Sequence, residues 1–416
     1  MKLTVDNFIS IKRAELELNN ITLIIGEQAE GKSLLAKLVY YFLMLIENPF
    51  LGRDRFDNIS ECIKEYKKEF QNRFYYQDND FFNIKFEIDS NLWYFLKYDS
   101  GNGLQLEISK AIGTFITKHI RLNNSEKELF IDNIKRLIKY KGEIQQLFGS
   151  INYKKALFID SARSYYGILE KTWLPLIKEN IKFADPFLFE YGDLLQKAKA
   201  VAGNEKFRNW GSDNKVSINH YNNILKLLSN NILKGDYRAI NGDEYIISGN
   251  ERKTMIANTS SGQKETLPIV LILKALISND IYDYMRFKEI IIEEPESHVF
   301  PSTQKDLVDF ISFVYKLNDD NHFLITTHSP YILTAFNNLI LAGETYNDAD
   351  QKVKNKIAKI MVKECLLRSK EVTAYHLESG VLKPIMDKET GLILAEGLDK
   401  VSEDIGEQFS QLLDLD

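Results

Sequence analysis

The segment from Gly26 to Ser33 has the residue types and spacing of a loop that binds phosphate. It reads Gly-Glu-Gln-Ala-Glu-Gly-Lys-Ser, which matches the pattern G-x-x-x-x-G-K-S/T. Its glycines let the backbone curl so that N–H groups point at phosphate oxygens. The Lys32 ammonium can reach the β- and γ-phosphates, and the Ser33 hydroxyl can bind Mg²⁺. We therefore predict a nucleotide and Mg²⁺ site formed by Gly26, Glu27, Gln28, Ala29, Glu30, Gly31, Lys32 and Ser33. The loop alone does not separate a kinase from a GTPase or a motor protein.

Two carboxylates follow an apolar run later in the chain. Residues Ile290 to Ile292 have strand character and lead directly into Glu293 and Glu294. One carboxylate at such a strand end can hold a metal ion, and a second can orient and deprotonate water that attacks a phosphate. We assign Glu293 to the metal and Glu294 to the water. The alternative is a solvated acidic turn, which is common after a core strand.

A serine- and glycine-rich loop and a late histidine are further candidates. The loop includes Ser260, Ser261, Gly262 and Gln263, and hydroxyl and glycine N–H groups at a helix start can bind an anion. The alternative is an ordinary helix cap in a surface loop. His328 directly follows the apolar strand Phe323–Thr326, and its place there makes it a candidate, although a single histidine is more often a packing residue.

The elements that must position these residues can be read from the apolar pattern. The run Ile21–Ile25 favours a strand before the phosphate loop, and residues 32–46 favour a helix after it. Alternating apolar residues between positions 82 and 108 predict an antiparallel sheet. The pattern is mostly helical from about 110 to 232, and strands return near Tyr237. These signals predict an α/β protein with an N-terminal lobe (1–110), a helical insertion (111–235) and a C-terminal lobe (236–416).

Composition narrows the classes of protein that fit. The chain has 416 residues, 53 Lys plus Arg and 59 Asp plus Glu, for a net charge of −6. This balance argues against a strongly basic surface that holds nucleic acid, but it leaves a local basic groove possible. Cys62 and Cys365 are too few for a disulfide framework and are predicted to be buried thiols. No signal peptide and no membrane-length apolar run is present, so we expect a cytoplasmic protein that does not contact membranes.

In their order along the chain, the four motifs resemble those of ABC-type ATPases. Thr259-Ser260-Ser261-Gly262-Gln263 is similar to the signature loop of that family, and His328 is similar to its switch histidine. The resemblance implies that His328 touches the γ-phosphate. It also implies a homodimer that sandwiches ATP, with the phosphate loop of one copy facing Ser260 and Gly262 of the other. The long interval between Lys32 and Ser260 is typical of the RecF, SMC and OLD branch rather than of transporter subunits.

The acidic strand end resembles the OLD-like ATPases known as AAA15 and AAA21. Glu293 to Pro301 reads Glu-Glu-Pro-Glu-Ser-His-Val-Phe-Pro, close to the strand end of those proteins. Phe300 stands where the D-loop aspartate of ABC-type ATPases would fall. Glu293 replaces the aspartate that usually ends the Walker B strand. A short stretch around Arg163 also resembles a segment of this family. The alternative is that Arg163 is an ordinary surface arginine.

The same resemblance implies a biological role. The 88 residues after His328 are few for the Toprim nuclease of OLD proteins. The chain therefore resembles stand-alone ATPase subunits of bacterial phage-defence pairs, such as that of the PARIS system. Expected partners are a second or further copies of the chain, a Toprim-like nuclease effector encoded nearby and a phage trigger protein. The alternative is a RecF-like repair ATPase that clamps DNA.

Overall fold

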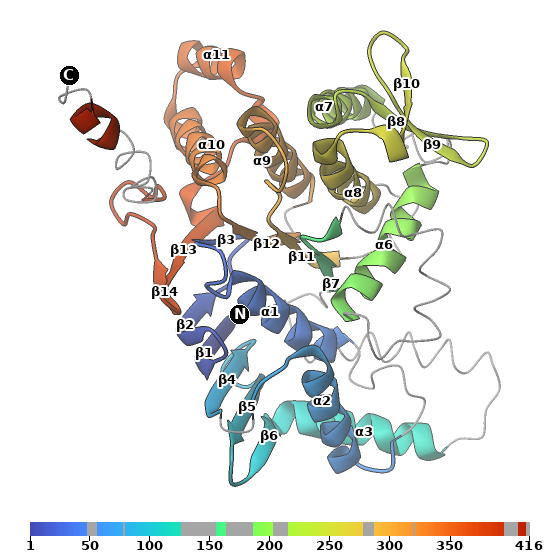
Figure 1. The fold of residues 1–416 in the computed structure, drawn as a ribbon, viewed down its shortest axis with the longest axis vertical. Helices are drawn as coiled ribbons and strands as arrows, with labels where there is room; N and C mark the ends of the chain where they lie inside the picture. Colours follow the sequence, from blue (N-terminus) through green and yellow to red (C-terminus); the bar gives the residue numbers. More distant parts are fainter. Residues whose placement is uncertain are drawn as a thin grey trace.

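A large mixed sheet carries the phosphate loop and the other candidate residues (Figure 1). The computed structural model describes residues 1–47, 56–77, 80–125, 155–163, 186–202, 215–277, 287–318, 321–394 and 407–412. Within them, eleven strands form one sheet in the order β6-β5-β4-β1-β2-β14-β13-β3-β12-β11-β7. The predicted α/β class is confirmed.

One half of this sheet is antiparallel. Buried apolar residues alternate with more exposed ones along its strands, so that one face packs against a core. The predicted antiparallel strands are present, but they continue into the central sheet through the pairing of β4 with β1. These strands are β1 (Lys2–Phe8), β2 (Ile11–Glu17), β4 (Phe82–Glu87), β5 (Trp93–Asp99) and β6 (Gly103–Ile108).

The other half is built from parallel strands that place the candidate residues. β3 is buried along its whole length and lies between β12 and β13, while β11 lies between β12 and β7. Because the carboxyl ends of parallel strands meet at one edge, the segments that follow β3, β7, β11 and β12 come together there. The strands are β3 (Ile21–Gly26), β7 (Lys155–Ile159), β11 (Phe287–Glu293), β12 (His322–Thr327) and β13 (Val372–Glu378), with β14 (Val381–Pro384) antiparallel to β13.

Helices cover both faces of the parallel strands and create two apolar cores. Along β3, Ile21, Leu23 and Ile25 belong to one core, whereas Ile24 belongs to the other. The first core includes helices α6 (Pro186–Ala202), α7 (Lys215–Leu233), α8 (Ser261–Leu276), α9 (Pro301–Leu317) and α10 (Pro330–Asp348). The second includes α1 (Lys32–Glu47), α2 (Ile59–Arg73) and α3 (Lys110–Ser125). Figure 1 shows α1 on the opposite side of the sheet from α8, α9 and α10.

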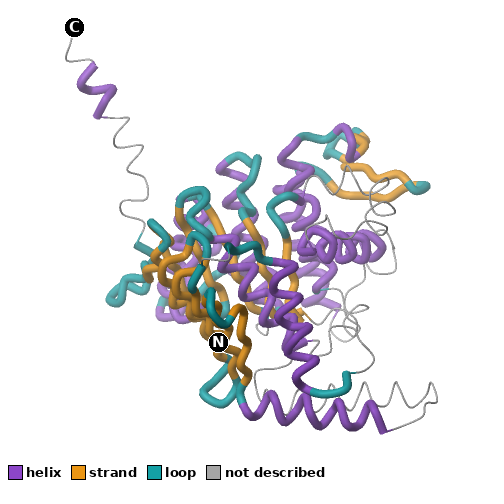
Figure 2. The backbone as a smooth tube through the Cα atoms, turned by 60° about the horizontal axis from the view of Figure 1, so that its bottom comes forward, coloured by secondary structure: helices purple, strands orange, loops and turns teal. Residues whose placement is uncertain are grey.

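Smaller elements complete the chain. A separate antiparallel sheet of β8 (Asp236–Ile240), β9 (Asp243–Ile247) and β10 (Lys253–Met255) precedes α8. Short 3₁₀ turns lie at Ile256–Asn258, Lys363–Cys365 and Ser369–Glu371. Helix α11 (Gln351–Ile360) follows α10, and a last helical turn spans residues 407–412, apart from the body of the molecule in Figure 2.

The predicted helical insertion can be compared only in part. Residues 126–154, 164–185 and 203–214 of this range lie outside the described residues. Its described portion is helical apart from β7, a strand of the central sheet that the apolar pattern did not reveal. Cys62 and Cys365 are buried thiols, as predicted. No helix in the described part of the chain has the length and apolar character needed to cross a membrane.

Candidate functional site

The phosphate loop has the curled backbone that its glycines predict. It joins β3 to α1, and Gly31 has φ +109°, a value that side-chain-bearing residues rarely adopt. A Cβ atom on Gly31 would also lie 2.5 Å from the Ser10 hydroxyl. Gly26 is equally constrained, because a Cβ there would collide with the Leu377 carbonyl of β13. The first N–H groups of α1 have no partner inside the helix, so this loop presents donors to an anion.

Lys32 lies at the centre of the site. Its ammonium donates to the carbonyl oxygens of Gly26 at 2.9 Å and Glu27 at 2.8 Å, and it is 3.1 Å from Nδ1 of His328. The side chain is 4% exposed, and burial lowers its pKa, while Glu294 and other carboxylates act in the opposite direction. The contact with His328 brings together two predicted site residues that are 296 positions apart.

A hydrogen-bonded chain continues from Lys32 through His328 to Glu294. Nε2 of His328 is 2.8 Å from Oε1 of Glu294. With Nδ1 accepting from Lys32 and Nε2–H donating to Glu294, a neutral imidazole satisfies both contacts. The bond from His328 is the main reason that the pKa of Glu294 is lowered. Glu294 is therefore ionised near neutral pH, as a group that accepts a proton from water must be.

The backbone of Glu294 is held in an uncommon conformation. Its φ is +43°, in the left-handed region, which costs of order 1–3 kcal/mol for a residue with a side chain. Three hydrogen bonds to backbone atoms of Glu294 hold this conformation, one of them from the Ser297 N–H to the Glu294 carbonyl at 3.0 Å. The N–H of Glu294 donates to the Thr326 carbonyl of β12 at 2.9 Å, and its carbonyl accepts from Nη2 of Arg163 at 2.6 Å. The carboxylate consequently points toward His328 rather than continuing the line of β11.

Arg163 is fully buried, which excludes the alternative of a surface arginine. Besides Glu294, its guanidinium donates to the carbonyls of Glu293 at 2.7 Å, Asp160 at 3.2 Å and Glu265 at 3.0 Å. Its Nε is also 3.4 Å from the Glu265 carboxylate. Glu265 lies in α8, directly after the signature-like loop. Arg163 therefore joins the end of β7, the acidic end of β11 and the start of α8.

The predicted metal ligands Ser33 and Glu293 lie beside a second carboxylate, that of Asp160. Ser33 hydrogen-bonds the Glu293 side chain, and burial together with the Asp160 carboxylate raises the pKa of Glu293 to about 7. Glu293 is 2% and Asp160 6% exposed, and Oε1 of Glu293 has no hydrogen-bond partner among the described residues. A divalent cation would relieve the repulsion and satisfy this oxygen, so the donor set fits Mg²⁺. Asp160 was not among the predicted ligands, since nothing near it in sequence indicates a metal.

Other described residues do not form a complete metal cage. No group of three or more His, Cys, Asp or Glu side chains is arranged to hold a metal ion in the part of the chain that the structure describes. Mg²⁺ commonly takes only one or two carboxylates from a protein and completes its shell with water and phosphate oxygens. The three side chains at Ser33, Glu293 and Asp160 suit that pattern.

The Glu296 carboxylate holds the backbone of His328 in position. Its carboxylate accepts from the backbone N–H of His328 at 2.6 Å and from the Thr327 hydroxyl at 2.8 Å. Burial raises the pKa of Glu296. The sequence indicated the acidic strand end as a whole, but it did not distinguish this supporting role from those of Glu293 and Glu294.

The signature-like loop forms the start of α8. Ser260 caps the helix: its hydroxyl accepts from the Gln263 N–H at 3.2 Å, and Gln263 Oε1 accepts from the Ser260 N–H at 3.2 Å. Gln263 also donates to the Leu233 carbonyl at 2.7 Å. Gly262 packs against the segment after Glu296, because a Cβ on it would lie 3.0 Å from the His298 carbonyl. Ser260 and Ser261 remain exposed, available to a ligand from outside the chain.

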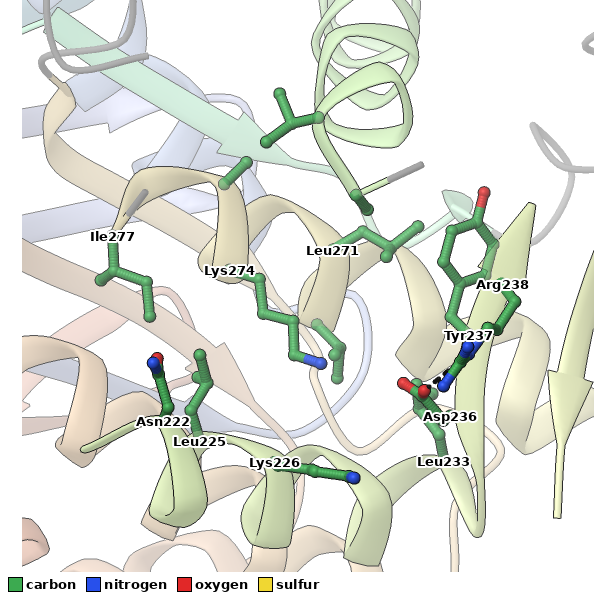
Figure 3. Close-up of a pocket in the computed structure, with 14 residues that line it drawn as sticks. Asn222, Leu225, Lys226, Leu233, Asp236, Tyr237, Arg238, Leu271, Lys274 and Ile277 are labelled. Carbon is green, nitrogen blue, oxygen red and sulfur yellow. Dashed lines mark hydrogen bonds and ion pairs between the residues drawn. The ribbon is translucent and has the colours of Figure 1, made fainter. Parts of the chain in front are cut away.

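A separate cavity lies away from these residues. It has a volume of about 300 Å³ and is lined by α6, α7, α8 and β8, with none of the predicted site residues in its wall. Figure 3 shows Lys226 and Lys274 along it, and Arg238 paired with Asp236 at 3.0 Å. Its lining is mainly apolar, which does not suit the charged phosphates of a nucleoside triphosphate.

Comparison with known families adds to this geometry. Residues 193–333 match the family described as AAA ATPase domain, AAA_15. The match covers about a third of the chain. The matched range holds the signature-like loop, the acidic end of β11 and His328, while the phosphate loop at 26–33 lies outside it. No curated protein matches the chain in sequence.

Several solved structures align with most of the chain at low sequence identity. The SMC head domain from Thermotoga maritima has a TM-score of 0.38 and 10% identity, over 92% of this chain and 97% of that one. An Smc head domain with an extended coiled coil, bound to the C-terminal domain of ScpA and derived from Pyrococcus furiosus, has a TM-score of 0.37 and 13% identity, over 97% and 98%. The recombination mediator protein RecF has a TM-score of 0.33 and 12% identity, over 92% and 97%.

Proposed function

We propose that the chain binds ATP with Mg²⁺ at residues 26–33 and hydrolyses it to ADP and phosphate. The observation that supports this most directly is the chain of contacts from Lys32 through His328 to Glu294. It joins the phosphate loop to an ionised carboxylate, and the family of the domain at 193–333 is one of ATPases. The site thus combines phosphate donors with a group that can accept a proton.

Each side chain has a role in the proposed reaction. Lys32 turns from the loop carbonyls toward the β- and γ-phosphates of bound ATP, and His328 contacts the γ-phosphate. Glu294 orients a water molecule and takes its proton as the oxygen attacks phosphorus and the bond to ADP breaks. Ser33 and Glu293, with Asp160 beside them, would hold Mg²⁺, which when bound neutralises charge on the phosphates.

Two substitutions separate binding from hydrolysis. Lys32→Ala should abolish ATP binding measured with a fluorescent nucleotide, because the loop loses its only ammonium. Glu294→Gln should bind ATP normally but release phosphate about 10²–10⁴-fold more slowly, the usual contribution of a positioned base. Glu389→Gln, an exposed substitution of the same kind, is the control. Phosphate release by Glu294→Gln at the wild-type rate would show that Glu294 is not the base.

We also propose that two copies sandwich ATP, with Ser260, Ser261 and Gly262 of one copy facing the phosphate loop of the other. The exposure of both serines at the start of α8 supports this arrangement. Ser260→Arg should then abolish turnover without weakening ATP binding by the other loop. Asn250→Arg, on an exposed turn, is the matched control. If turnover survives Ser260→Arg but not Lys32→Ala, the sandwich is refuted.

For the biological role, we propose an ATPase of a bacterial phage-defence pair, similar to that of the PARIS system. It would sequester or license a Toprim-like nuclease encoded nearby until a phage protein is sensed. The OLD-like residues from Glu293 to Pro301, together with the match to AAA_15, support this role. The alternative is a RecF-like ATPase that clamps DNA.

One purification distinguishes these roles. Tagged Glu294→Gln is isolated from its native locus with ATP and Mg²⁺ and analysed by native mass spectrometry. A stoichiometric second protein on a dimer or larger ring would support the defence role. Homodimers with bound DNA and no protein partner would support the repair role, and duplex binding should then fall steeply with salt.

A further inference from the structure

The net charge of the chain is concentrated in its last residues. Positions 395–416 contain seven acidic residues and one lysine, a net charge of −6, which equals that of the whole chain. Residues 1–394 therefore carry equal numbers of acidic and basic side chains. The same segment is also amphipathic, with apolar residues three or four positions apart, as a helix requires. These apolar residues are Leu398, Val401, Ile405, Phe409 and Leu412.

The described end of this segment exposes its apolar side. All residues of the turn at 407–412 are exposed, with Phe409 at 63% and Leu412 at 65%. Large apolar side chains that are this exposed and aligned on one side of a helical turn indicate a site that binds another apolar surface. A partner for this segment needs an apolar stripe and positive charge.

Helix α11 has both features. It contains Lys352, Lys354, Lys356 and Lys359 and no acidic residue, and none of its residues is buried. Lys352, Lys356 and Lys359 have no ion-pair partner among the described residues, whereas Lys354 lies over the Tyr346 ring. Next to the lysines runs an apolar stripe of Val353, Ile357 and Ile360, and Ile360 is 79% exposed.

The chain can bring these two surfaces together. Ile393, just before the acidic segment, is fixed to α10 by two hydrogen bonds with the Asn337 side chain, at 2.7 and 2.8 Å. From Asn337 to the end of α10 at Asp348 is about 16 Å of helix, and α11 begins shortly after. Residues 395–406 can span up to about 40 Å when extended. The acidic segment is therefore tethered within reach of α11 of its own chain, at a high effective concentration.

We propose that the acidic C-terminal segment, residues 395–416, docks on the basic and apolar face of α11 in the same chain. Phe409 and Leu412 lie against the stripe of Val353, Ile357 and Ile360, and the flanking acidic residues pair with the lysines. This contact is independent of ATP hydrolysis, so it can be tested whether or not the proposed function holds.

Cross-linking in the full-length protein tests the proposal. Ala358→Cys on α11 and Gln408→Cys in the last turn introduce two exposed thiols, treated with a short bismaleimide. The native thiols interfere little, because Cys62 and Cys365 are both 0% exposed and burial raises the pKa of Cys62 to about 11. We expect a cross-link within one chain, identified by peptide mass spectrometry, at a yield that does not change on dilution.

Charge reversal provides the matched comparison. Lys356→Glu with Lys359→Glu should lower the yield roughly tenfold, as expected for several lost surface ion pairs. Lys64→Glu with Lys68→Glu, on the exposed side of α2, should leave it unchanged. Adding Glu403→Lys and Glu407→Lys to the α11 reversal should restore the yield.

Three outcomes would overturn the proposal. The first is a yield equal in both reversal variants. The second is a cross-link found only between two chains and lost on dilution, which would make the occupant a second copy. The third is no cross-link in a protein whose α11 lysines instead bind duplex DNA.

Discussion

Arg163→Lys should slow ATP hydrolysis strongly while leaving ATP binding almost unchanged. Arg163 touches none of the phosphate-loop residues, but its guanidinium holds the carbonyls of Glu293 and Glu294 from inside the protein. Lysine keeps the charge but cannot reproduce the planar fork of donors. We therefore expect the bond at 2.6 Å to the Glu294 carbonyl to be lost or weakened.

The size of the effect follows from the strained backbone of Glu294. A left-handed residue stores of order 1–3 kcal/mol, and a hydrogen bond from a charged group contributes about 1.5–3 kcal/mol. When the bond is lost, φ can relax from +43° and move the carboxylate away from His328. Since 1.4 kcal/mol corresponds to a factor of ten, kcat should fall roughly 10- to 100-fold. The Kd of ATP should change less than about threefold, well below 1.4 kcal/mol.

Phosphate release and binding of a fluorescent ATP analogue measure the two quantities. Arg73→Lys is the control, because Arg73 has a 3% exposed side chain and pairs with Glu69 and Glu190 far from the site. It should cost stability but not kcat. If Arg163 acts through Glu294, Arg163→Lys should cause no further loss in a Glu294→Gln background. Equal losses of kcat in both arginine variants, or additive losses in the double variant, would refute the reasoning.

Three further predictions concern the loop and the metal site. In EDTA, Glu293→Gln should raise the melting temperature at pH 8 but hardly at pH 5. The pKa of the Glu293 carboxyl rises to about 7 on folding, so the wild-type protein loses about 3 kcal/mol of stability as the pH climbs from about 4.5 to 7. Equal shifts of the melting temperature at both pH values would contradict this. Asp160→Asn should raise the Mg²⁺ concentration needed for half-maximal hydrolysis about tenfold or more, and an unchanged Mg²⁺ titration would remove Asp160 from the site. Gly31→Val should abolish ATP binding, whereas Gly103→Ala, also at positive φ but with open space around it, should retain binding and lose only about 1 kcal/mol of stability.

The sequence was sufficient where chemistry depends on neighbouring residues. The phosphate loop, the acidic end of β11 and the cap at Ser260 are local patterns, and the strand and helix around Lys32 follow from local apolar periodicity. The α/β class could be predicted for the same reason. His328 was identified because it directly follows a recognisable strand.

Long-range contacts explain what the sequence did not reveal. Arg163 is bonded to residues 102, 130 and 131 positions away, and no local pattern distinguishes such an arginine from an exposed one. The proposed metal-side role of Asp160 depends on β7 lying beside β11, which is a property of the sheet order. Strand β7 itself is short and lies within a largely helical region, so its place in the sheet could not be predicted.

The position of β13 and β14 determines when the site can form during synthesis. These strands, from the last part of the chain, lie between β2 and β3 and separate the N-terminal hairpin from the phosphate-loop strand. Gly26 rests against Leu377 of β13, and the Glu30 carboxylate accepts from the Gly380 N–H at 3.0 Å. The phosphate loop is made within the first 33 residues but cannot be supported until residues near 380 have left the ribosome. A nascent chain should therefore be unable to bind nucleotide until residues near 380 have emerged, and the exposed edge of β3 must be protected from aggregation throughout that time.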